Sequence, residues 1–449
     1  MNFIEYLAEL QNKYNITNKE IREELSQSGK PLSKSYLSHK LSGERRITED
    51  EFNLIVHTIR PTAAEEKKLR QLFSIYLYGE HEFKEVQRIR EYIMEFADDT
   101  TPHYDGSGAD LAGISAIGDE KTLIAVVLRL LSQAWGKEKI RIWCQPECKV
   151  VMDVLKFLSH KEPADVEHLL CLNNDYKRDS NVYNISSLKV LDKLVLRNAQ
   201  HKIHYYYDIV YSRIKGYNVF PYFILTENMA LLINEDCKGG HLIQDRALVL
   251  HLIAEFSQKY QQAEPLFEMV TDDVAYMMHM YKLEQEATAD TYILQYHPCL
   301  ALNRNEALTR SCIDEAYPHK EQLMQLFLER WELHRRINSH HLYSGEGKEE
   351  FLRTGVTSDM DPRIFRPLTP EERLAALQSS AENPTHHSME LNDGFLKIPA
   401  SLSLFCTDSG RMLISFDNSS SNRLIMQERS MHRSMLHFFK YVLKYEAFK

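Results

Sequence analysis

The chain has 449 residues, of which 43% are hydrophobic and 26% charged, and its formal net charge at pH 7 is −10. This length suffices for two or three domains with sizeable cores. It contains no run of about 18 apolar residues and no apolar segment behind a basic start, which excludes a membrane-spanning protein and a secretory leader, so we expect a cytoplasmic protein without membrane contact.

The first 60 residues contain the start and stop signals of three short helices. The first and third helices begin at capping boxes, in which a Thr side chain and a Glu three residues later satisfy each other's backbone N–H groups. The second begins at a Ser N-cap and ends at a Gly. This pattern predicts an all-α helix-turn-helix head over residues 1–60. The residues are Thr17 with Glu20, Ser33 with Gly43, and Thr48 with Glu51.

The segment from Leu32 to Arg46 resembles the recognition helix and following basic turn of Cro and phage-repressor type regulators. The resemblance covers about 45 of 449 residues, and the turn before this helix, residues 26–32, is two or three residues longer than is usual in that family. It implies that the start of the helix reads double-stranded DNA in the major groove. The implied base contacts come from Lys34, Ser35 and Ser38 with His39 beside them, and the phosphate contacts from Lys40, Arg45 and Arg46.

The charge distribution agrees with this interpretation. Residues 1–60 contain nine basic and nine acidic residues, so the net charge of −10 lies in the remainder of the chain. Between Lys30 and Arg46 there are five basic residues against Glu44 alone. A local excess of this kind releases counterions from DNA, whereas the acidic body does not suit tracking along nucleic acid. The alternative is a small helical bundle that serves protein contacts only.

Two longer amphipathic helices are expected over residues 61–97. Regulators of this type bind two half-sites as symmetric dimers, so these helices are candidates for a homodimer contact. Alternatively they complete the core of the head. Residues 98–118 are rich in Gly and Asp and lack periodicity, which predicts a linker.

The remaining chain alternates helical and strand patterns, which predicts an α/β body with a mainly parallel sheet. Two strands, a polar loop and a closing amphipathic helix occur twice, at an offset of 181 to 183 residues. We therefore expect an α+β multidomain protein with a two-lobed α/β body, lobe 1 at 119–265 and lobe 2 at 266–449. The equivalent segments are Phe223–Thr226 with Leu404–Thr407, Leu231–Ile233 with Met412–Ile414, Leu242–Arg246 with Leu424–Arg429, and Phe256 with Phe439.

No motif in the body identifies a reaction. A two-lobed body with repeated hairpins resembles phospholipase D, whose signature is His-x-Lys with a downstream Asp in each lobe, but none of the 20 histidines has Lys two residues later. The segment Ser344–Lys348 lacks the glycine spacing and the Ser or Thr of a phosphate loop. We interpret His340–His341 and His386–His387 as exposed loop histidines, the first pair within a loop over residues 338–367.

The cysteines and a tyrosine run complete the candidate residues. Seven cysteines at irregular spacing indicate reduced core thiols, and Cys144 with Cys148 lacks a second ligand pair for zinc, so no metal or cofactor is expected. In the run Tyr205–Tyr207 at least one ring faces outward or lines a cleft between the lobes. Alternatively the run is core on one face and sheet surface on the other.

Together these features favour a DNA-binding, one-component transcriptional regulator. The body would bind an unknown small-molecule, peptide or protein effector, and the chain would form a homodimer. The alternative is an enzyme of unfamiliar type that its head recruits to DNA, or a body that only binds another protein. The sequence identifies no catalytic residue.

Overall fold

The structure is a computed structural model of the chain. It describes residues 1–27, 33–97, 103–104, 110–160, 162–174, 180–210, 219–270, 273–299, 305–357, 361–382, 384–391, 394–416, 423–426 and 428–445. Most of the long turn at 26–32 and about half of the expected linker lie outside the described residues. The chain divides into two compact units, Met1–Gln87 and Arg88–Lys449, which are described one at a time.

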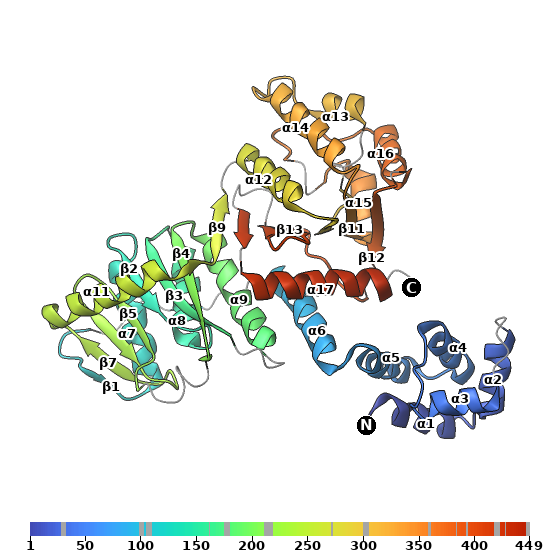
Figure 1. Ribbon diagram of the computed structural model, residues 1–449. Coiled ribbons are helices and arrows are strands. Elements are labelled where there is room, and N and C mark those ends of the chain that lie inside the picture. The colour runs from blue at the N-terminus through green and yellow to red at the C-terminus, as the bar shows by residue number, and fades with distance from the viewer. Residues whose placement is uncertain are drawn as a thin grey trace. The chain divides into compact units, whose positions relative to one another are not determined.

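The first unit, here called the head, is all-helical. Its three expected helices are present, and the capping boxes at Thr17 and Thr48 form as expected. The sequence patterns did not identify the first helix, which begins at a further capping box formed by Asn2 and Glu5. The helices of the head are α1 (Phe3–Lys13), α2 (Asn18–Gln27), α3 (Lys34–Leu41), α4 (Glu49–Ile59) and α5 (Ala63–Tyr78), coloured blue in Figure 1.

One aromatic core holds the head together, and α5 belongs to it. The rings of Phe52 in α4 and Phe73 in α5 stack with centroids 3.9 Å apart, and Phe3 of α1 packs edge-on against Phe52 at 5.9 Å. Glu65 of α5 accepts two hydrogen bonds from the end of α1. One comes from Lys13 Nζ at 2.5 Å and the other from the Tyr14 hydroxyl at 2.6 Å. The core of the head therefore continues past residue 60, because α5 completes it.

The second unit, here called the body, contains two mixed β-sheets, which agrees with the expected α+β multidomain fold. The first sheet has the strand order β1 (Ala116–Ile117), β7 (Gly240–Ile243), β6 (Ala230–Ile233), β5 (Tyr222–Leu225), β2 (Ile140–Trp143), β3 (Val166–Asn173), β4 (His201–Asp208), β8 (Glu264–Pro265). The second has the order β9 (Phe267–Val270), β15 (Arg423–Met426), β14 (Met412–Phe416), β13 (Leu402–Thr407), β10 (Asp290–Gln295), β11 (Asn338–Ser344), β12 (His386–Leu391).

The two sheets repeat one topology. In each, three parallel strands (β2, β3, β4 and β10, β11, β12) continue into an antiparallel set that begins beside β2 or β10. The repeated segments form antiparallel hairpins in both sheets, where Ile224 pairs with Leu231 and Phe405 pairs with Leu413, a register that differs by one residue between the two copies. The internal repeat is therefore confirmed. The expectation of a mainly parallel sheet was wrong, because the hairpins themselves extend each sheet with antiparallel strands.

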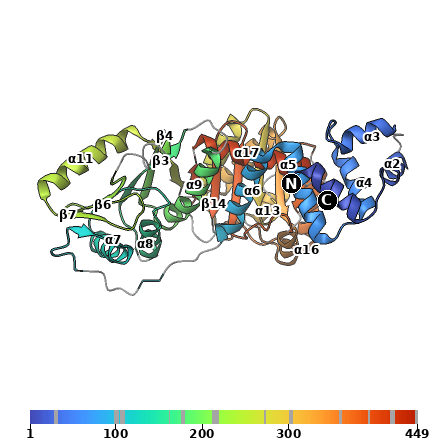
Figure 2. The ribbon, with the colours of Figure 1, turned by 90° about the horizontal axis from the view of Figure 1, so that it is seen from below.

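Helices cover both faces of each sheet. In lobe 1, α11 covers one face, where Phe256 packs with Leu169 and Leu225, and α7, α8 and α9 cover the other (Figure 2). In lobe 2, α17 lies on one face and α12, α14, α15 and α16 on the other. None of the described helices has the length and apolarity to cross a bilayer. The helices are α7 (Glu120–Ala134), α8 (Lys149–Ser159), α9 (Ser180–Arg197), α11 (Arg246–Gln262), α12 (Asp273–Glu286), α13 (Glu306–Cys312), α14 (Lys320–Leu333), α15 (Gly345–Thr354), α16 (Pro370–Glu382) and α17 (Arg429–Tyr445).

The segment from residue 338 to 367 was expected to be a loop, but it contains β11 and α15. His341 and His386 lie on neighbouring strands and are buried, so the interpretation of these pairs as exposed loop histidines was wrong for both residues. His340 is also paired on β11, opposite His387 of β12, and its ring nitrogen lies 3.1 Å from Asp290. The polar composition of these strands concealed them, because Ser339 and His340 of β11 bond to Thr291 and Asp290 of the neighbouring strand β10.

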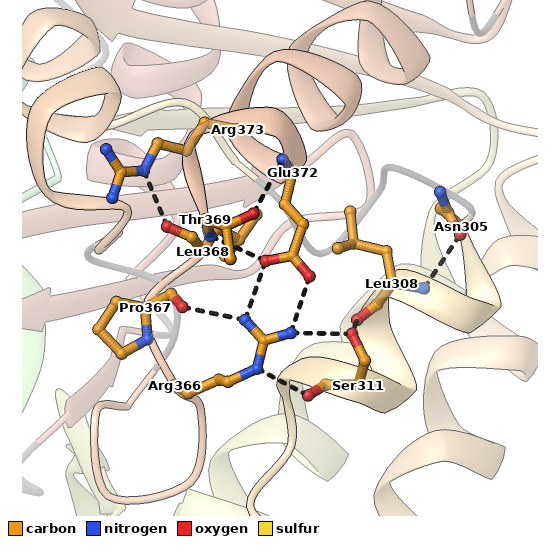
Figure 3. A network of polar contacts seen from close by, with 9 residues as sticks. All are labelled: Asn305, Leu308, Ser311, Arg366, Pro367, Leu368, Thr369, Glu372 and Arg373. Atoms are coloured by element: carbon orange, nitrogen blue, oxygen red, sulfur yellow. Dashed lines mark hydrogen bonds and ion pairs between the residues drawn. The ribbon is translucent and has the colours of Figure 1, made fainter.

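The end of the same segment is fixed by charged side chains (Figure 3). Arg366 forms a two-pronged ion pair with Glu372, at 2.8 and 2.9 Å, and also donates to the Ser311 carbonyl at 3.0 Å. This pair, together with a hydrogen bond from the backbone of Thr369, lowers the pKa of Glu372 to about 2. The helix expected to start at Pro370 begins there as α16. The network joins the start of α16 to the end of α13.

The two lobes meet along α9 and α17. The Asn184 amide donates to the Ser430 hydroxyl at 3.1 Å, and the Tyr207 hydroxyl donates to the buried carboxylate of Glu428. Tyr205 is buried on the same face as Tyr207. In the run Tyr205–Tyr207, one ring was expected to face outward or to line a cleft. Tyr207 is 37% exposed, and its hydroxyl reaches lobe 2.

Helix α6 (Glu80–Met94) begins in the head and ends in the body, followed by the short helix η1 (Glu95–Ala97). Its Tyr92 hydroxyl donates to Asp192 of α9 at 2.5 Å, and both side chains are buried. Lys193 of α9 donates to the backbone carbonyl of Glu95 at 2.7 Å. The end of α6 is thus anchored on the same helix that joins the lobes.

The buried Asp192 predicts a distinct pH dependence. Burial raises its pKa from 3.8 to about 7, although Tyr92 donates to it. Because the folded pKa lies above the unfolded one, the contribution is complete below about pH 4 and is lost as the pH rises through about 7, a change of about 4 kcal/mol. We expect Asp192→Asn to abolish this part of the decline. Unfolding by urea at about pH 4 and about pH 8 measures it, and identical pH slopes in the two proteins would contradict the assignment.

Candidate nucleic-acid interface

The proposed DNA-reading helix is α3, which begins after its N-cap residue Ser33. The Ser33 hydroxyl accepts from the backbone N–H of Tyr36 at 3.2 Å, which fixes the first turn. Leu37 points into the head core and is 2% exposed. Gly43, at φ +83°, then turns the chain away, because a left-handed backbone favours glycine. This arrangement leaves Lys34, Ser35, Ser38 and His39 exposed on the outer side of one short helix.

Lys40 does not belong to this surface. It was expected to face outward toward phosphate, but its side chain is 3% exposed and its Nζ lies 2.6 Å from Glu51 Oε1. Burial disfavours the charged ammonium, yet the hydrogen bond to Glu51 outweighs this effect and raises the pKa of Lys40. Position 40 lies on the same side of the helix as Leu37 and Leu41. The expectation that Lys40 contacts a DNA phosphate was therefore wrong.

The basic turn after α3 is held by two tyrosines that the sequence reading missed. The Arg45 guanidinium lies over the Tyr36 ring at 5.3 Å, and the buried Lys40 approaches the same ring at 4.8 Å. From α5, the Tyr76 hydroxyl donates to the Arg45 carbonyl and accepts from the Ile47 N–H, both at 3.3 Å. Arg45 is therefore presented from a fixed backbone. Tyr36, nine residues before Arg45, was visible as an aromatic residue within the reading segment, whereas Tyr76 lies 31 residues after Arg45 and gave no local signal.

His39 has an acidic partner. Its Nδ1 lies 2.5 Å from Glu44 Oε2, and both side chains are exposed. An exposed pair of this kind contributes little stability. The exposed cationic side chains that α3 and its turn present within the described residues are then Lys34, Arg45 and Arg46, with Ser35 and Ser38 as neutral hydrogen-bonding groups between them. This set is smaller than the seven residues expected from sequence.

The burial of Lys40 gives a prediction that separates folding from binding. Lys40→Ala leaves the Glu51 carboxylate without its buried cation, so we expect the head to lose about 1–3 kcal/mol of stability. The exposed Lys34→Ala should leave unfolding unchanged within about 0.5 kcal/mol. Denaturant unfolding followed by far-UV circular dichroism measures both. Equal stability of the two variants would show that Lys40 is not a structural residue.

In the body, titratable groups converge on the face of the lobe 2 sheet that α12 and α14 cover. Glu284 of α12 accepts from Arg330 Nε at 2.8 Å and Nη2 at 2.5 Å, and His334 Nε2 lies 3.1 Å from it. The Nδ1 of His334 lies 2.7 Å from the Ser339 hydroxyl. This order of carboxylate, imidazole and hydroxyl is that of a nucleophilic triad, but each member is at most 1% exposed. A substrate cannot reach it, and the arginine already neutralises the carboxylate, so the network stabilises lobe 2.

The glycine-containing segment that was excluded as a phosphate loop has a structural role. Ser344 caps α15, accepting from the Gly347 N–H at 2.9 Å. A side chain at Gly347 would place its Cβ 1.9 Å from the Tyr296 carbonyl oxygen, so only glycine fits. Within the described residues, no group of three or more His, Cys, Asp or Glu is placed to hold a metal ion.

No family model matches this chain, and no curated protein matches it in sequence. Among solved structures, TrmBL2, an archaeal chromatin protein with a novel mode of DNA binding, shows 11% identity and a TM-score of 0.23, covering 56% of this chain and 100% of that one. The phosphatidylserine synthase of Haemophilus influenzae Rd KW20 shows 8% identity and a TM-score of 0.22, covering 81% and 91%. At such TM-scores neither similarity carries an argument about fold or function.

Proposed function

We propose that the chain is a DNA-binding transcriptional regulator whose head reads duplex DNA and whose body binds an effector. The observation that supports this most directly is the outer side of α3. There Lys34, Ser35 and Ser38 are exposed beside Arg45 and Arg46, while Leu37 fixes the helix in the core. A helix that is short, capped and rigidly held presents base-reading groups with little loss of entropy on binding.

The division of charge supports the same proposal. Between Lys30 and Arg46 the sequence has five basic residues against one acidic residue, whereas the net charge of −10 belongs to residues beyond 60. DNA is attracted by the local cations of the head and repelled by the body. A homodimer in the cytoplasm would present two such helices to two half-sites, and an effector would act by favouring one arrangement of the heads.

The proposal is tested by titrating the purified chain into a fluorescently labelled random-sequence duplex and recording anisotropy at two salt concentrations. If the three exposed cations Lys34, Arg45 and Arg46 each neutralise one phosphate, raising the salt from about 50 to about 200 mM should weaken binding about 40-fold. A labelled single strand of equal length serves as the control, and it should bind more weakly. Binding that does not depend on salt, or that prefers the single strand, would contradict the proposed function.

A further inference from the structure

An exposed histidine near the end of α3 and a glutamate of the following turn form one unit. The Nδ1 atom of His39 lies 2.5 Å from Glu44 Oε2, and the two side chains are 47% and 63% exposed. An ionised carboxylate only accepts hydrogen bonds, so the Nδ1 atom carries the proton that it donates to Glu44. This bond leaves Nε2 as the ring nitrogen that can contact another molecule.

The turn that carries Glu44 is fixed against the backbone carbonyl of His39. That carbonyl oxygen accepts from the Arg45 backbone N–H at 2.9 Å and from the Ser42 hydroxyl at 3.2 Å. Gly43, whose φ is +83°, allows the chain to reverse direction. Because the backbone beside Glu44 is fixed, its carboxylate stays within reach of the imidazole, and the ring of His39 is oriented before any ligand binds.

Several other charged groups around α3 have partners of their own. In the helices packed against α3, acidic side chains of α2 and α4 pair with basic groups, and an arginine of the turn lies over a tyrosine ring. The pairs are Glu24 with His57, Glu51 with Lys40, and Arg45 with Tyr36. Within the described residues, the charged group in contact with His39 is Glu44. The protonation of this imidazole therefore depends on Glu44 and on the ligand that approaches Nε2.

Glu44 is also the one acidic residue between Lys30 and Arg46. A carboxylate that faces phosphates opposes binding, and a protonated imidazole beside it cancels its charge. Protonated His39 is a donor at Nε2, and guanine presents two acceptors, N7 and O6, in the major groove. Resting on the proposed function of the head, we infer that His39, oriented by Glu44, reads guanine in its protonated form, so that DNA binding takes up a proton.

The neutral imidazole would read a different base. When Nδ1 donates to Glu44, neutral His39 has a lone pair at Nε2, which accepts from the amino groups of adenine or cytosine but not from guanine N7 or O6. Histidine changes its charge between about pH 5 and pH 8. Binding to a site that contains this guanine should therefore tighten about tenfold from about pH 8 to about pH 6, because a larger fraction of the free protein is already protonated.

The test is selection from a pool of random duplexes by the full chain at about pH 6 and about pH 8, followed by sequencing and by anisotropy titration of the enriched duplex. We expect guanine at one position of each half-site at the lower pH and a weaker preference there at the higher pH. His39→Arg, which is always charged, should keep guanine at both pH values. His39→Gln should exchange guanine for adenine at the same position, since Gln pairs with adenine.

Glu44→Gln separates orientation from charge. This variant loses a negative charge near phosphate, so its affinity for random duplex should not fall, but its guanine preference should weaken because the imidazole loses the carboxylate that orients it. A role of Glu44 in folding alone would instead lower the affinity for all sequences together. The matched control is His57→Gln on α4, which removes another exposed histidine with a glutamate partner and should keep the wild-type motif and pH dependence.

Two outcomes would overturn the inference and leave the proposed function intact. One is an enriched motif with the same base preferences at both pH values, and the other is a His39→Gln variant that retains the wild-type motif. A pool without any enriched sequence would contradict the proposed DNA-reading function itself, and this inference with it.

Discussion

Replacing Lys34, Arg45 and Arg46 together by alanine should weaken binding to duplex DNA about 100-fold and reduce the slope of log affinity against log salt by about 2 to 3. These are the exposed cations that α3 and its turn present. Each cation that neutralises a phosphate releases about one counterion, so losing these three cations lowers both the affinity and its salt dependence. Lys34 stands at the start of α3, and Arg45 is positioned by Tyr36 and Tyr76.

The matched control is a variant that loses three positive charges outside α3 and its turn. Lys67, Lys68 and Lys84 are exposed on α5 and α6, and their replacement by alanine also lowers the net charge by three. This variant should lose only the general attraction, about a few-fold in affinity at low salt. Equal losses in the two triple variants would show that α3 is not the reading surface. Unchanged unfolding curves establish that the α3 variant is folded.

The second large effect is expected for Glu284→Ala, which should reduce the free energy of unfolding by about 3–5 kcal/mol. Arg330, at 1% exposure, would keep its charge without its carboxylate partner. Burial opposes ionisation of Glu284, but Arg330 and His334 outweigh it and lower the pKa of Glu284 to about 2. The carboxylate is therefore charged at neutral pH, and its removal leaves an unpaired buried cation. Urea unfolding at pH 7 measures the loss.

Two further variants identify the cause of that loss. Glu286→Ala, two residues along α12 and partly exposed near Arg411, should cost less than about 1 kcal/mol. The double replacement Glu284→Met with Arg330→Met removes both charges, so it should be less destabilising than Glu284→Ala alone. If the double variant is the least stable, the network contributes through its hydrogen bonds to His334 rather than through charge pairing.

Local signals allowed much of the head to be predicted. Capping boxes at Thr17 and Thr48 are read from residues three apart, and each forms as expected because the partners are neighbours on one turn. Lys40 was misplaced for the opposite reason. Its partner Glu51 lies on another helix, and a charged residue next to Leu41 gives no local sign that it is buried.

In the body, the repeat revealed the topology but not the polar strands. Apolar hairpins such as Phe223–Thr226 have a strong period, and their second copies made the equivalence visible. β11 contains Ser339, His340 and His341, whose hydrogen bonds come from the residue that follows α14, from β10 and from the segment after β10. Pairings over such distances are not encoded in neighbouring residues.

The sequence specificity of the head tests the central proposal most directly. The purified chain is mixed with a pool of random duplexes at low and moderate salt, and the retained DNA is sequenced. We predict enrichment of a two-fold symmetric motif whose half-sites are one helical turn apart, about 10 base pairs, or a multiple of it, with enrichment that survives the higher salt. Retention without any enriched sequence would contradict the account of α3 as a reading helix and leave the head as a general anchor.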